Sequence, residues 1–115
     1  MIRLSLSLAA LSLVSCATVQ LPADRLQSSE ASIRSAEELG ANAVPTARLH
    51  LQYAKDETAS AKKLAADGDP AALLMLAKAD ADAELALGLA REVSVHGEAQ
   101  RAAEDLKAVR ARPSP

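Results

Sequence analysis

Aromatic side chains are nearly absent from the 115-residue sequence, which has no tryptophan, no phenylalanine and a single tyrosine, Tyr53. Proteins that bind single strands of nucleic acid stack the bases on aromatic side chains. They also need a basic surface for the phosphate backbone, whereas the formal net charge here is −2. The composition therefore predicts no nucleic-acid partner, and it favours Tyr53 as a packing residue over a binding residue.

Residues that bind metals or perform catalysis are also scarce. His50 and His96 are the only histidines and lie far apart, whereas a zinc site needs three or four ligands. Asp80, Asp82 and Glu84 do not converge as a calcium loop does, so we expect them on a solvated helix face. The sequence has neither a glycine-rich phosphate loop after a strand nor a serine in a sharp glycine-flanked turn. It therefore predicts no metal, no cofactor and no enzymatic activity.

Cysteine occurs once, as Cys16, directly after an apolar segment. One positive charge, Arg3, precedes the apolar stretch 4–14, which is too short to span the ~30 Å hydrocarbon core of a bilayer. A positive start, a short apolar run and small residues are typical of a secretory signal peptide, which is removed. We therefore expect residues 1–15 to be a signal peptide.

The residues around the cysteine, Leu13-Val14-Ser15-Cys16, resemble a bacterial lipobox. The resemblance implies cleavage after Ser15, diacylglyceryl transfer to the Cys16 sulfur and an acylated amino terminus, with residues 16–21 as lipidated cysteine and tether. Two or three acyl chains anchor a protein firmly in a membrane. In such lipoproteins an aspartate directly after the cysteine favours retention in the inner membrane. This sequence has Ala17 there, so the resemblance implies a protein at the periplasmic face of the outer membrane. The alternatives are an ordinary signal peptide with an incidental cysteine and a cytosolic protein with an apolar start.

Alanine and leucine dominate the remaining sequence, and β-branched residues are few, which favours helices. Proline suits the first helical position, aspartate caps a helix start, and glycine closes a helix end. Such residues divide the sequence at Pro22, Gly40, Pro45, Gly68, Asp69 and Pro70. We therefore predict one helical domain over residues 22–111 and a disordered tail over 112–115, with helices at about residues 22–39, 45–66 and 70–111.

Apolar and small residues recur at alternating steps of four and three in the second and third predicted helices, which is the spacing of a packing seam. In the second helix they are Ala47, Leu51, Ala54, Thr58, Ala61 and Ala65. In the third helix they are Ala72, Leu76, Ala79, Ala83, Ala86, Ala90 and Val93. The first helix contributes Leu26, Ile33 and Leu39. The pattern predicts an all-α fold, an antiparallel helical hairpin or three-helix bundle with a long third helix.

After Val93 a second apolar stripe follows the third predicted helix, out of phase with the first. Its members are Val95, Ala99, Ala102, Leu106 and Val109. Two helices of about 20 residues cannot cover a third of about 40, which is roughly 60 Å long, so the end of the third should project. The sequence favours a solvated, partly frayed helix here, weakest at residues 93–97, with an i,i+4 ion pair of Arg101 and Asp105 beside the stripe. The alternative is that the stripe is a partner face.

The segment between Gly40 and Ala90 resembles a bacterial family, the alanine-rich helical domain of unknown function 4398. The resemblance is carried by Gly40-Ala41, Val44-Pro45, the leucine and alanine spacing up to Ala66, the turn at Gly68 and residues 77–90. Members of this family are mostly short lipoproteins. The resemblance implies an envelope lipoprotein with a helical hairpin, and it implies no activity.

Together these observations predict a non-catalytic envelope lipoprotein, held to the membrane by lipid on Cys16, whose helices serve as a structural or protein-interaction module. The expected partner is another envelope protein. Self-association as a coiled coil is the main alternative, and binding of a lipid or small ligand between the helices is a further one.

Overall fold

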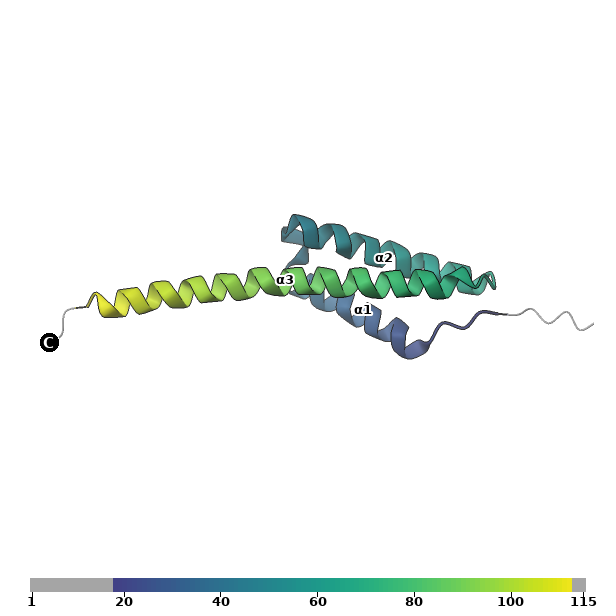
Figure 1. The fold of residues 1–115 in the computed structure, drawn as a ribbon, viewed down its shortest axis with the longest axis horizontal. Coiled ribbons are helices and arrows are strands. Elements are labelled where there is room, and N and C mark those ends of the chain that lie inside the picture. The colour runs from purple at the N-terminus through teal and green to yellow at the C-terminus, as the bar shows by residue number, and fades with distance from the viewer. Residues whose placement is uncertain (1–17, 113–115) are drawn as a thin grey trace, which may run out of the picture.

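The structure is a computed structural model that describes residues 18–112, and every regular element in this range is helical. The elements are α1 (Ala23–Glu38), the short 3-10 helix η1 (Ala41–Ala43), α2 (Pro45–Ala66) and α3 (Ala71–Arg110). Figure 1 shows α1 and α2 beside one half of the long α3. The predicted all-α fold with a long third helix is confirmed. The predicted signal peptide, cleavage after Ser15, lipidation of Cys16 and most of the tail lie outside the described residues.

Proline, aspartate and glycine set the ends of the helices as local chemistry predicts. Gly40 and Gly68 follow α1 and α2 with φ of 82° and 74°, the left-handed region that glycine adopts without a steric penalty. Pro70 already has helical angles, and the Asp69 Oδ1 accepts a hydrogen bond of 2.8 Å from the backbone N–H of Ala71. Asp69 therefore caps α3, which stabilises the sharp reversal between α2 and α3.

The core is a seam of alanines between α2 and α3, with few bulky side chains. The buried residues of α2 are Ala47, Leu51, Ala54, Thr58 and Ala61. Those of α3 are Ala72, Leu76, Ala79, Ala83, Ala86, Leu87 and Ala90. Alanine lets two helix backbones approach closely, towards the low end of the usual ~8–10 Å interaxial distance. The predicted seam is confirmed up to Ala61 in α2 and up to Ala90 in α3, whereas Ala65 is only half-buried. The prediction for Val93 is wrong, because this side chain is 52% exposed.

Helix α1 contributes small residues to the core more than large ones. Its buried residues are Ser29, Ile33 and Ala36. Leu26 is only half-buried, and Leu39 is 40% exposed. Of the three α1 residues expected at the seam, only Ile33 is therefore buried.

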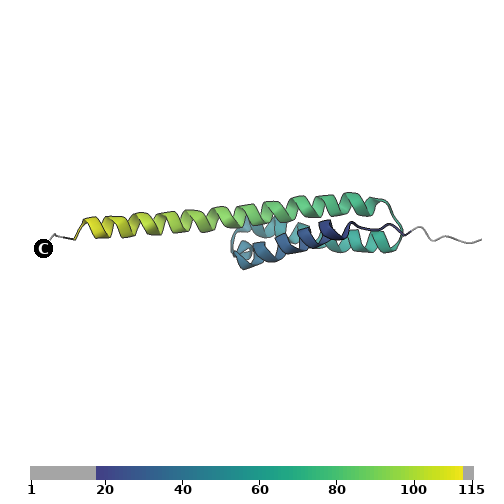
Figure 2. The same ribbon diagram turned by 90° about the horizontal axis from the view of Figure 1, so that it is seen from below.

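The second half of α3 has no neighbouring helix. Figures 1 and 2 show α3 continuing well past the ends of α1 and α2, and none of residues 91–112 is buried. We call residues 91–110 the projecting segment. It is helical throughout, including residues 93–97, where the sequence suggested a weakness. Residues 18–22 lie at the opposite end of the molecule, beside the turn between α2 and α3 (Figure 1).

Two glycines offer a test of this backbone. Gly97→Ala should stabilise the projecting segment by about 1 kcal/mol, because alanine is the better helix former and its Cβ would meet only Arg101 Nη2, at 3.6 Å. Gly40→Ala should instead destabilise the protein by about 1–2 kcal/mol, because φ is 82° there. Far-UV circular dichroism and hydrogen exchange of residues 91–110 measure the first effect, and urea unfolding measures the second. Equal effects of both substitutions would contradict the described backbone.

Candidate functional site

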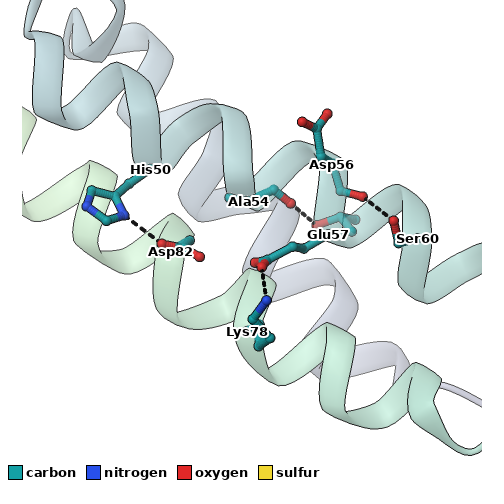
Figure 3. A network of polar contacts seen from close by, with 8 residues as sticks. His50, Ala54, Asp56, Glu57, Ser60, Lys78 and Asp82 are labelled. Atoms are coloured by element: carbon teal, nitrogen blue, oxygen red, sulfur yellow. Dashed lines mark hydrogen bonds and ion pairs between the residues drawn. The ribbon is translucent and has the colours of Figure 1, made fainter.

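Two polar contacts join α2 and α3 along one flank of the alanine seam (Figure 3). His50 Nδ1 lies 2.6 Å from Asp82 Oδ1, and Lys78 Nζ lies 2.6 Å from Glu57 Oε1. The hydrogen bond that Lys78 donates to Glu57 raises the pKa of Lys78 above its ordinary value. Each of these contacts joins one residue of α2 to one residue of α3, so they hold the two helices in register.

The acidic cluster of α3 is part of this scaffold, and the prediction that it forms a solvated face is wrong for two of its three members. Asp82 points towards α2, whereas the Asp80 Oδ2 accepts a hydrogen bond of 2.5 Å from Arg25 Nη2 of α1. Both aspartates are only about one-fifth exposed, with side-chain exposures of 20% and 21%, while Glu84 is exposed. Residues two apart on a helix point about 200° from one another, so the two carboxylates flank the seam on opposite sides.

Lysines of α2 make the corresponding contacts with α1. Lys62 donates a hydrogen bond of 2.6 Å to Glu30 Oε1, and Lys55 pairs with Glu37. The hydrogen bond from Lys62 lowers the pKa of Glu30 below its ordinary value of 4.5. The stabilisation from this pair is therefore complete above pH 4.5 and is lost as the pH falls through the lowered pKa. These pairs are largely exposed, so each contributes little to stability.

A groove between α1 and α3 is lined mainly by polar side chains. Its walls include Ser28, Ser29, Ser32, Asp80 and Glu84. Ser29 Oγ and Asp80 Oδ1 are buried there, and neither has a hydrogen-bond partner among the residues that the structure describes. A nucleophilic serine needs a base within hydrogen-bond reach, an arrangement that the buried hydroxyl of Ser29 lacks within residues 18–112.

Metal ligands do not converge in the part of the chain that the structure describes, where no group of three or more histidine, cysteine, aspartate or glutamate side chains could hold an ion. His50 is engaged with Asp82 and stands edge-on to the ring of Tyr53, at a centroid distance of 6.2 Å. Tyr53 is 47% exposed and lies at the rim of the packing surface. Of the helices within residues 18–112, none is both long and apolar enough to cross a membrane.

The remaining candidate is the apolar stripe of the projecting segment. The structure exposes all five of its predicted residues, with Val95 at 63%, Leu106 at 50% and Val109 at 61%. The prediction of an ion pair between Arg101 and Asp105 is wrong, because the only close contact between side chains of this kind in this segment within residues 18–112 joins His96 Nε2 to Glu92 Oε1, at 4.0 Å. The charged side chains beside the stripe are thus exposed to solvent and available to a partner.

No protein-family model, no curated protein and no solved structure matches this chain. Its class is therefore defined by its fold alone, as a three-helix bundle from which the last helix extends. The resemblance to the domain of unknown function 4398 stays a prediction.

Proposed function

We propose that the protein is a lipid-anchored component of the bacterial cell envelope, with a non-catalytic helical bundle that presents the projecting segment to a protein partner. The single observation behind the docking role is the exposure of Val95, Leu106 and Val109 on the projecting segment of α3, which neither α1 nor α2 covers. Apolar side chains gathered on one face of an exposed helix are typical of surfaces that bind another helix or a groove.

The position of the amino-terminal residues supports an anchored arrangement. Residues 18–22 lie beside the turn that starts α3, and the projecting segment lies at the other end (Figures 1 and 2). Six extended residues from Cys16 to Pro22 would reach at most about 20 Å. An acylated Cys16 would therefore hold the bundle close to the bilayer and direct the projecting segment away from it, starting about 30 Å along α3 and ending about 60 Å along it.

The polar groove between α1 and α3 gives less support to the alternative of a lipid carrier. An acyl chain needs mostly apolar walls, whereas Ser28, Ser32 and Asp80 line this groove. The side chains that could serve as acids or bases at the helix contacts are paired with one another, as His50 is with Asp82. We therefore propose neither ligand transport nor catalysis for the bundle.

The anchor is tested by replacing Cys16, the only cysteine. Cys16→Ala should move the protein from the membrane fraction to the soluble fraction and remove the mass of the lipid from the intact protein. Ser15→Ala is the matched control, because it keeps a small residue before the cysteine and should leave the protein acylated. A wild-type protein that carries no fatty acid and retains residues 1–15 would contradict the anchored function.

The docking role is tested by deleting residues 95–115, which leaves every buried residue of the described chain in place. The crosslinked partners of the anchored protein in envelope fractions should then disappear, while circular dichroism still shows a folded bundle. Partners that persist unchanged after this deletion would show that the projecting segment does not bind them.

A further inference from the structure

The apolar stripe does not begin in the projecting segment but continues along the whole of α3. Six residues at intervals of seven form its first row, and all six are exposed: Leu74, Ala81, Gly88, Val95, Ala102 and Val109. The second row, also at intervals of seven and also exposed, is Leu85, Glu92, Ala99 and Leu106. Lys78 would extend this second row, but its Nζ is bound to Glu57 of α2. We call the ten residues of the two rows the outer face.

The outer face points away from the rest of the bundle. At 100° per residue, the centre of its rows lies about 140° around the helix axis from the buried seam of Ala72, Ala79 and Ala86. Figure 2 shows α1 and α2 together on one side of α3, with the opposite side uncovered from end to end. A second helix could therefore lie along α3 without contacting α1 or α2.

We propose that the occupant of the outer face is a second copy of this chain, paired through α3 in a parallel, left-handed coiled coil. This proposal rests on the proposed function and names its partner. Two apolar rows that repeat every seven residues are the pattern of a left-handed two-helix coiled coil, because the repeat of 3.5 residues per turn is slightly shorter than that of a straight helix. A copy of α3 in register has the same rows over the same length, so that each row residue meets its own counterpart.

The charges beside the outer face fit a parallel pair. The seven positions of the repeat are labelled a to g, with the second row at a and the first row at d. Asp105 then lies at a g position and Arg110 at the following e position, so Asp105 of each copy faces Arg110 of the other. Glu92, the one charged residue within the rows, stands next to the g position of Arg91 and can pair with Arg91 of the second copy. Neither Asp105 nor Arg110 forms an ion pair within residues 18–112. Acylation of both copies in one membrane would also place their amino-terminal ends side by side, which is the parallel orientation.

Four of the ten row positions hold alanine or glycine and a fifth holds Glu92, so the rows bury only a modest apolar area. The pairing should therefore be weak in solution and favoured on a membrane. Anchoring both copies in one leaflet restricts them to a thin layer and raises their effective concentration, to the mM range for closely tethered partners. Glu92 in the rows weakens the pair further, as polar residues at such positions do, while restricting its register.

Sedimentation equilibrium of residues 17–115, which contain all of the described bundle, tests the pairing. We expect the average mass to rise towards that of a dimer as the concentration approaches about 1 mM. Val95→Lys with Ala102→Lys, both on the outer face, should weaken association at least ten-fold. Val93→Lys with Ala108→Lys is the matched control, since it places the same charges at exposed positions of the same segment outside the rows. A monomer at every concentration, or equal effects of both double variants, would overturn the proposal.

Disulfide formation tests the parallel orientation with a different readout. Residues 17–115 contain no cysteine, so Ala102→Cys provides a single thiol at a row position. In a parallel pair the two Cα atoms of residue 102 would lie within the 4.4–6.8 Å that a disulfide spans. Ala102→Cys should therefore oxidise to a covalent dimer at least ten times faster than the control Ala108→Cys. Equal rates would overturn the parallel arrangement.

The two proposals can fail separately. If the anchored protein crosslinks through residue 102 only to a different protein, the second copy is excluded as the partner and the docking role stands. If the covalent dimer forms in vitro but Cys16→Ala leaves the protein in the membrane fraction, the lipid anchor is contradicted and the pairing stands.

Discussion

Replacement of Leu51 by alanine is expected to lower the free energy of unfolding by about 2–5 kcal/mol, the range for removing a fully buried leucine side chain. Leu51 is 1% exposed and belongs to the cluster that joins all three helices, alongside Ile33, Ala54 and Ala83. Most of its buried neighbours are alanines, which cannot extend into the cavity that the lost side chain would leave. Small domains are stable by only about 5–15 kcal/mol, so this single change removes a large share of the total.

Leu49 provides the matched control for this substitution. It lies two residues away on the same helix but is 48% exposed. Leu49→Ala removes the same atoms from the same backbone, so it should change the free energy of unfolding by less than about 0.5 kcal/mol. Urea unfolding followed by circular dichroism measures both variants. Similar losses for Leu49→Ala and Leu51→Ala would mean that the described face of α2 is not the one packed against α3.

The boundaries of the helices could be predicted because they depend on single residues with strong local preferences. Pro45 begins α2, Gly68 adopts positive φ after it, and Asp69 caps α3, as expected from their chemistry. The observed bounds of α1, α2 and α3 lie within one residue of the predicted ranges 22–39, 45–66 and 70–111. The seam of α2 and α3 followed from periodicity alone, since an alanine every three or four residues is informative even where side chains are small.

The role of α1 could not be predicted, because it packs through residues that carry little apolar signal. Ser29 and Ala36 are buried in α1, whereas Leu39, an expected core residue, is 40% exposed. A short helix with small buried residues gives no clear hydrophobic periodicity. For the same reason the pairing of Asp80 with Arg25 was not foreseen, since it requires knowledge of which helix lies beside that flank of α3.

The candidate docking face was only partly predicted. The sequence indicated an apolar stripe from Val95 to Val109. It suggested that the apolar face of α3 changes near Val93, from the seam to this stripe. In the structure both faces exist together along α3, one buried and one exposed from Leu74 onwards. Periodicity reports that a face is apolar but not which of two faces is covered by the rest of the chain. Val93 continues the spacing of the buried seam but is exposed, because α3 has no neighbouring helix beyond Ala90 that could cover it.

The alanine seam also implies that this bundle should tolerate larger core residues poorly, and Ala54 is the position where the effect should be clearest. Ala54 is 0% exposed within the cluster that joins the three helices, and its carbonyl accepts a 2.7 Å hydrogen bond from Thr58 Oγ1. Inserting a larger side chain into a tightly packed core costs about 1–3 kcal/mol or more. We expect Ala54→Leu to reach about 3 kcal/mol, since alanine at this seam sets the closeness of the backbones.

The control is Ala59→Leu, which places the same side chain on the exposed face of α2. Leucine and alanine are both good helix formers, so this variant should unfold within about 0.5 kcal/mol of the parent. The measurement is urea unfolding, with thermal melting as a second readout. If Ala54→Leu were as stable as Ala59→Leu, the helices would have to be further apart than the alanine seam requires. Close packing of small residues would then not be what holds α2 against α3.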